Sequence, residues 1–210
     1  MEIQNFGANC FRLTTKKANI IVDDNLEELK GKNQIKKGDI VLFTTAHGAI
    51  AKEDNFVLDQ PGEFEVSRVS INGIAARSHM DEEGKKSATI FKVVTEDIRV
   101  LFVGHIHPDL TEEQLEQIGL IDIMIVPVGG SGYTLDGVGA LKVIKKVEPK
   151  IVIPSHYSDA KLKLSYPVPQ TSLEEAVKQL GMEIHEKTEK LKLKSSDIPE
   201  ASQLVVVEAS

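Results

Sequence analysis

The sequence predicts one α/β domain in which two β-sheets pack face to face and helices cover the outside. The first hundred residues are short, β-branched runs separated by turn sequences, which is typical of strands. The second half alternates strand and helix patterns. Of the 210 residues, 41% are hydrophobic and 27% are charged, as in globular domains with a substantial core. No linker, low-complexity segment or short repeat interrupts the chain, so we expect a single domain over residues 1–210.

Nine strands are expected in the first half, because each apolar run ends in a turn or loop signal. Such signals include Asp23-Asp24-Asn25, the Pro-Gly pair at 61–62 and the acidic Gly-containing stretch 81–84. The expected strands cover residues 2–6, 10–14, 18–22, 39–44, 55–58, 64–66, 69–76, 88–94 and 98–103.

The second half opens with Thr111, followed three residues later by Gln114, a capping-box pattern that predicts a short amphipathic helix. Longer helices are expected over 136–147 and 172–180. The strands between and after them should cover 121–126, 151–154, 183–185 and 202–208, the last a buried strand.

Charge and cysteine content narrow the function classes. The net charge of −7 disfavours non-specific binding to nucleic acid or to an anionic membrane. The single cysteine, Cys10, cannot form an internal disulfide, and we interpret it as a buried structural thiol in a reducing compartment. No window approaches about 18 consecutive apolar residues. We therefore expect a cytoplasmic protein without a membrane anchor or nucleic-acid partner.

Histidines follow the expected strands at the positions where α/β folds gather ligand-binding loops. His47, His79, His105 and His156 each come shortly after a strand-like run. His107, just before Pro108, is a spare ligand or an exposed loop residue, and we favour the second interpretation. His185 follows a late strand away from these loops and is expected on the surface.

Four stretches of the chain, taken in order, resemble the small metallo-β-lactamase-fold hydrolases, in particular the branch grouped with ascorbate-6-phosphate lactonase. They are residues 5–13, 59–66, 125–130 and 151–157, the last containing Pro154-Ser155-His156-Tyr157. The resemblance implies an αββα four-layer sandwich. It also implies a metal-dependent hydrolase.

The resemblance also implies that the metal motif is degenerate. The family pattern H-x-H-x-D-H, which serves two metals, matches a stretch in which only His47 persists. Thr45, Ala49 and Ile50 replace the first histidine, the aspartate and the last histidine, and His105 replaces the aspartate that bridges the metals. Because both aligned carboxylates are missing, we expect one divalent ion, zinc by preference, bound by His47, His79, His105 and His156.

Three neutral imidazoles and a water form an open zinc site, whereas four protein ligands close it. The general base is left open. Acidic residues near His79 or near the Pro-Gly turn are alternatives, but we prefer surface turns for them: Asp81, Glu82, Glu83, Asp59 and Glu63. Tyr157 donates a hydrogen bond to substrate or simply packs.

The expected function is a divergent metal-dependent hydrolase of a small metabolite. The alternative is a non-catalytic protein that keeps the pocket for a metal, a ligand or a partner. A scaffold without metal is the third hypothesis. The sequence leaves the substrate and the oligomeric state open.

Overall fold

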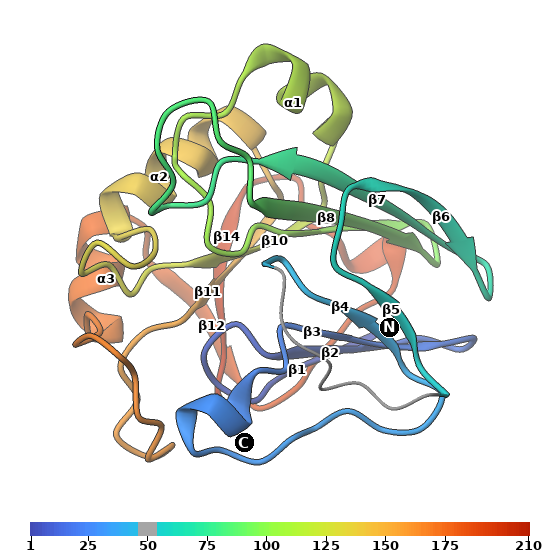
Figure 1. The fold of residues 1–210 in the computed structure, drawn as a ribbon, viewed down its shortest axis with the longest axis horizontal. Coiled ribbons are helices and arrows are strands. Elements are labelled where there is room, and N and C mark those ends of the chain that lie inside the picture. Colours follow the sequence, from blue (N-terminus) through green and yellow to red (C-terminus); the bar gives the residue numbers. More distant parts are fainter. Residues whose placement is uncertain (46–53) are drawn as a thin grey trace.

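The described residues form a sandwich of two β-sheets with three α-helices against one outer face (Figure 1). The computed structural model describes residues 1–45 and 54–210. The smaller sheet has the strand order β13 (Leu191–Lys192), β1 (Glu2–Asn5), β2 (Phe11–Thr14), β3 (Asn19–Val22), β4 (Ile40–Leu42) and β5 (Phe56–Leu58). The larger sheet has the order β12 (Ile184–Thr188), β14 (Gln203–Val207), β11 (Ile151–Ser155), β10 (Ile123–Pro127), β9 (Ile98–Phe102), β8 (Ala88–Thr95), β7 (Val69–Ala76) and β6 (Gly62–Val66). The predicted fold class is confirmed.

The strand sequences explain why two sheets form. In β3, Ile20 and Val22 point between the sheets and pack on residues of the larger sheet such as Phe91 and Phe102. Ile21 points the opposite way and joins a separate cluster on the outer face of the smaller sheet. Since successive side chains of a strand alternate between faces, a strand that is apolar on both faces must be covered on both.

Helices cover the outer face of the larger sheet. These are α1 (Glu112–Ile118), α2 (Gly137–Val147) and α3 (Leu173–Leu180). The buried side of α2 packs with Leu101, Met124 and Val152 of the sheet. The capping box predicted at α1 is present, because Thr111 accepts from the Gln114 amide and Gln114 accepts from the Thr111 amide.

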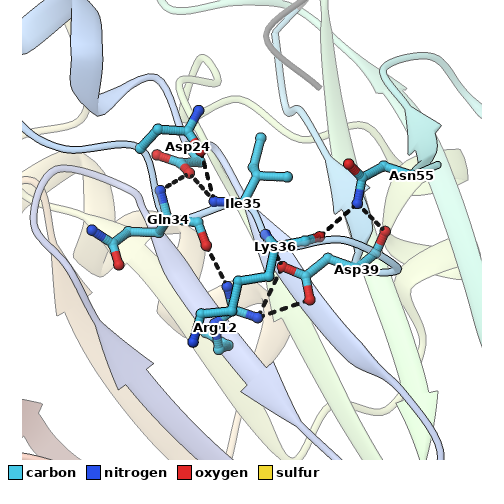
Figure 2. A network of polar contacts seen from close by, with 8 residues as sticks. Arg12, Asp24, Gln34, Ile35, Lys36, Asp39 and Asn55 are labelled. Atoms are coloured by element: carbon cyan, nitrogen blue, oxygen red, sulfur yellow. Dashed lines mark hydrogen bonds and ion pairs between the residues drawn. The ribbon is translucent and has the colours of Figure 1, made fainter. Parts of the chain in front are cut away.

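The outer face of the smaller sheet carries a short 3-10 helix, η1 (Leu26–Leu29), and a loop instead of long helices. Polar contacts hold this loop (Figure 2). Arg12, only 4% exposed, donates to Asp39 at 3.0 Å and to the Gln34 carbonyl at 2.6 Å. Asp24 accepts from the backbone of residues 34 and 35, and Asn55 binds the carbonyls of residues 36 and 39. The fourth layer of the expected sandwich is therefore clamped by a buried ion pair and hydrogen bonds.

The segment after α3 contributes strands to both sheets in turn. β12 lies in the larger sheet, β13 pairs with β1 in the smaller sheet, and β14 returns to the larger sheet between β11 and β12. A second 3-10 helix, η2 (Ser195–Asp197), separates β13 from β14. The two-residue strand β13 was not predicted from the sequence.

Among the described residues, none of the helices has both the length and the apolar character needed to span a membrane.

Candidate functional site

Two imidazoles meet at the carboxyl edge of the larger sheet. His105 follows β9 and His156 follows β11, and both strands run parallel to β10, which lies between them. The carboxyl ends of these strands therefore share one edge, as expected for ligand-binding loops of α/β folds. The centroids of the two rings are 4.8 Å apart and their planes are nearly perpendicular, at 89°.

His156 is held in one orientation and one tautomer. Its side chain is almost fully buried, its φ is +56°, and its amide donates to the Ala8 carbonyl at 2.9 Å. The Gln170 amide nitrogen donates to the Val168 carbonyl, so its oxygen, 2.8 Å from Nδ1 of His156, must accept. The proton therefore sits on Nδ1 and the lone pair on Nε2. Burial lowers the pKa of His156, which favours the neutral ring.

Two tyrosines complete the surroundings of the histidine pair. The Tyr133 ring lies 4.9 Å from that of His105, and the Tyr166 ring lies 5.1 Å from that of His156. The Tyr166 hydroxyl also accepts from the Ala8 amide at 3.2 Å. These tyrosines and Gln170 were missed by sequence reasoning, because they lie in irregular loops that match no recognisable motif.

In the glycine-rich loop at 129–132, Gly129 packs closely against the histidine site. A Cβ on Gly129 would lie 2.1 Å from the side-chain oxygen of Gln170 and 2.1 Å from the carbonyl oxygen of His156. Only glycine permits this approach.

His79 stands next to His107, with ring centroids 6.3 Å apart. Its backbone amide donates to the carbonyl of His105 at 2.7 Å, which ties the two histidine loops together. The Nδ1 atom of His79 is buried and has no hydrogen-bond partner among the described residues. A buried polar atom without a partner needs an explanation, and a bound metal or substrate group would supply one.

The described residues do not by themselves complete a metal site. Within residues 1–45 and 54–210, no three His, Cys, Asp or Glu side chains group closely enough to hold an ion. The predicted ligand His47, together with Ala49 and Ile50 of the degenerate motif, lies outside the described residues. The four-histidine set therefore stays a prediction. It has two neighbouring imidazoles and the unpartnered Nδ1 of His79 in its favour.

A buried carboxylate supports the loop beside His105. Asp23 accepts from the amide and the hydroxyl of Thr44 at 2.7 and 2.6 Å. Thr44 in turn packs so closely on Gly104 that a Cβ there would lie 2.3 Å from the Thr44 hydroxyl oxygen. Sequence reasoning placed Asp23 in a turn and did not give it this role.

Four of the five acidic residues considered as general bases lie in turns or loops, whereas Glu63 lies in strand β6. Asp81 accepts from the amides of Ser78 and Ser87 at 3.0 Å and from the Ser87 hydroxyl at 2.7 Å. Burial raises the pKa of Asp81, but these bonds and the charge of Lys85 outweigh it and lower the pKa to about 2. The other four carboxylates are exposed: Glu82, Glu83, Asp59 and Glu63. The preferred interpretation as surface residues agrees with this exposure, but the expected turn is wrong for Glu63, which is paired with Asn72 of β7.

The remaining singled-out residues are structural. Tyr157 packs in the core under the helices, and burial raises its pKa to about 12. Cys10 is fully buried, which confirms the interpretation of a buried thiol, and burial raises its pKa. His185 is exposed, as expected. His107 lies in a loop beside His79 with its side chain 24% exposed, and whether it is a ligand stays a prediction.

The fold and the site define a class of two-sheet α/β sandwiches with histidine-bearing loops at one edge. The chain belongs to the beta-lactamase superfamily, because the family profile described as "Beta-lactamase superfamily domain" matches residues 2–156. This chain is similar to a solved structure from Thermotoga maritima that is assigned as a Zn-dependent hydrolase of the metallo-beta-lactamase superfamily, and the two sequences are 27% identical. The TM-score is 0.75, and the match covers 100% of this chain and 99% of that one. A second solved structure, assigned as a metal-dependent hydrolase from Parabacteroides distasonis, shows the same fold with 20% identity, a TM-score of 0.65 and coverage of 99% and 93%.

Two curated relatives are similar over shorter segments, and both are described as UPF0173 metal-dependent hydrolases. The one from Archaeoglobus fulgidus is 30% identical over 97 residues, which is 45% of this chain and 39% of the relative. The one from Carboxydothermus hydrogenoformans is 46% identical over 44 residues, which is 21% of this chain and 19% of the relative. The chain thus matches about two fifths of one relative and one fifth of the other.

Proposed function

We propose that this protein is a metal-dependent hydrolase of a small metabolite that works with one divalent ion, zinc by preference. The proposed ligands are His47, His79, His105 and His156. The observation that carries the proposal is the pair His105 and His156, in which Gln170 leaves the Nε2 lone pair of His156 free for a ligand. The relatives described as metal-dependent hydrolases support the same activity.

The residues of the chain have distinct tasks in this proposal. Hydrolysis would need three of these four imidazoles to hold the ion, because a zinc ion with three protein ligands keeps an open position for a polarised water, whereas four protein ligands close the site. Gln170 fixes the tautomer of His156, and second-shell hydrogen bonds of this kind tune ligand basicity. Tyr133 and Tyr166 flank the pair and pack against its rings.

The proposal includes the degenerate motif and the likeness to the ascorbate-6-phosphate lactonase branch. Thr45, Ala49 and Ile50 stand where two imidazoles and a carboxylate would serve a second metal. Losing the assistance of a general base typically costs about 10²–10⁴-fold in rate. We therefore expect weak activity on generic esters, lactones and phosphodiesters.

The test is metal content, measured by mass spectrometry on protein purified without a metal-affinity tag or chelator. We expect about one equivalent in the wild type and a loss in His105→Ala and in His156→Ala. The matched control is His185→Ala, an exposed histidine outside the site. Protein without bound metal would contradict the proposal and favour the scaffold.

The same motif favours one second candidate, a non-catalytic module that binds a metal, a ligand or a partner. The variant that combines Thr45→His, Ala49→Asp, Ile50→His and His105→Asp tests the degeneracy, and the activity of the native protein distinguishes the two functions. If the motif is degenerate, the variant takes up a second metal equivalent and gains hydrolysis of an activated ester. A native protein that binds metal but does not hydrolyse any ester or lactone tested would favour the module.

A further inference from the structure

A cavity lies beside the histidine site, between the 77–87 segment and the start of α1. Its volume is about 300 Å³. Arg77, Lys85 and Lys86 line one part of it, and His107 lines another. The His107 ring is the neighbour of the His79 ring, at 6.3 Å, so the cavity adjoins the candidate metal site.

The lining of this cavity is cationic in an otherwise acidic protein. Three permanent cations face it, against two carboxylates, Glu83 and Asp109. Asp109 is bonded to Lys142, which offsets one negative charge, and Lys85 lies 3.5 Å from the Asp81 carboxylate, which offsets one positive charge. Arg77 and Lys86 then stand against Glu83. The chain as a whole carries a formal charge of −7. A local excess of positive charge on such a background concentrates small anions.

Of these three cations, Arg77 is held in place before any ligand arrives. The Nε and Nη2 atoms of Arg77 donate to the carbonyl of Asp81 at 2.9 and 2.8 Å. The carboxylate of Asp81 closes the same turn through Ser78 and Ser87. This arrangement fixes the guanidinium and leaves Nη1 available, which suits the recognition of anionic oxygens.

Lys86 is the cation with the most freedom to bind a ligand. Lys85 is within 3.5 Å of the Asp81 carboxylate. Lys86 has no hydrogen-bond or ion-pair partner among residues 1–45 and 54–210. A lysine that lines a cavity without a partner can contribute its full charge to a bound anion.

We propose that this cavity is a subsite for a doubly charged anionic group, such as a phosphate or a dicarboxylate, of the small molecule that the histidine site acts on. Arg77 and Lys86 are its recognition residues, and His107 forms its border with the metal site. The assignment to substrate rests on the proposed hydrolase function, whereas the binding of the anion does not.

The test is the titration of inorganic phosphate, and in parallel malonate, into chelator-treated protein at low salt, followed by calorimetry. The chelator removes metal, so that phosphate coordination to an ion cannot contribute. We expect saturable binding of at least one anion, about fivefold to tenfold weaker in Lys86→Gln. The matched control is Lys187→Gln, an exposed lysine on β12 at the far end of the larger sheet, which should bind as the wild type does. Absence of saturable binding, or equal weakening in both variants, would overturn the subsite.

A kinetic measurement separates this inference from the function on which it rests. If the protein hydrolyses an ester or lactone, the anion that binds should inhibit competitively, and Lys86→Gln should raise the inhibition constant by the same factor. Noncompetitive inhibition would overturn the assignment of the cavity as part of the substrate site. If no hydrolysis is found, the proposed function fails. The titration alone then decides whether the cavity binds an anion through Lys86.

Discussion

Replacing Gln170 with leucine tests how the fold prepares His156. The substitution removes the acceptor that lies 2.8 Å from Nδ1 of an imidazole that is only 4% exposed. A buried N–H without an acceptor costs about 1–3 kcal/mol. For a domain of this size, each kcal/mol lowers Tm by about 2–4 °C, so the expected loss is about 2–12 °C. The ring can escape part of this cost by moving its proton to Nε2.

Long-range ¹H–¹⁵N NMR spectra of the chelator-treated protein report this proton directly. The wild type should show His156 with the proton on Nδ1, and Gln170→Leu should shift the population towards Nε2. Gln170→Glu is the matched control, because its carboxylate still accepts from Nδ1 and should keep the wild-type tautomer. Finding the proton on Nε2 in the wild type, or the same tautomer in all three proteins, would refute the reasoning. Metal affinity should fall about 10–100-fold in Gln170→Leu.

Three further predictions concern contacts that stabilise the fold, two of them in loops near the histidines. Arg12→Met leaves the carboxylate of Asp39 buried without its partner, so the free energy of unfolding in urea should fall by about 3–5 kcal/mol. Adding Asp39→Asn should recover part of this loss. A double variant without any recovery would contradict a stabilising ion pair. Gly104→Ala forces a Cβ against Thr44 at a φ of +64° and should cost about 2–4 kcal/mol; a wild-type Tm would show that the two loops separate easily. The pKa of Asp81 is lowered to about 2, so its contribution to stability should be complete above about pH 4 and fade as the pH falls through 2. Unfolding curves of wild type and Asp81→Asn should converge over that window, and a constant difference would exclude a role for this ionisation.

The strands could be predicted well because their sequence patterns are local. Runs such as 69–76 and 98–103 are β-branched and end in turn signals, and both form strands close to the expected bounds. β13 could not be found, since Leu191–Lys192 lies in a lysine-rich stretch and becomes a strand only by pairing with β1. β12 extends to Thr188 through charged residues because it is an edge strand paired with β14.

The site could be predicted only in part. His105 and His156 could be assigned to ligand-binding loops because each comes just after a predicted strand. Their rings meet because these strands, β9 and β11, both lie parallel to β10 on its two sides. Gln170 follows His156 by 14 residues in an irregular loop, and its role depends on the tertiary path of that loop. A side chain of this kind has no periodicity or motif that a sequence could reveal.

The path of the chain through β12, β13 and β14 has a consequence for synthesis on the ribosome. At about 5–20 residues per second, the segment from residue 184 to residue 207 emerges only after all other strands have been translated. Until then β1 lacks its neighbour β13, and β11 lacks its neighbour β14. Until this segment is made, the nascent protein therefore exposes two open strand edges, which are the surfaces that chaperones protect and that invite misassembly. Both sheets gain their missing strands at the same stage, when this segment has been made.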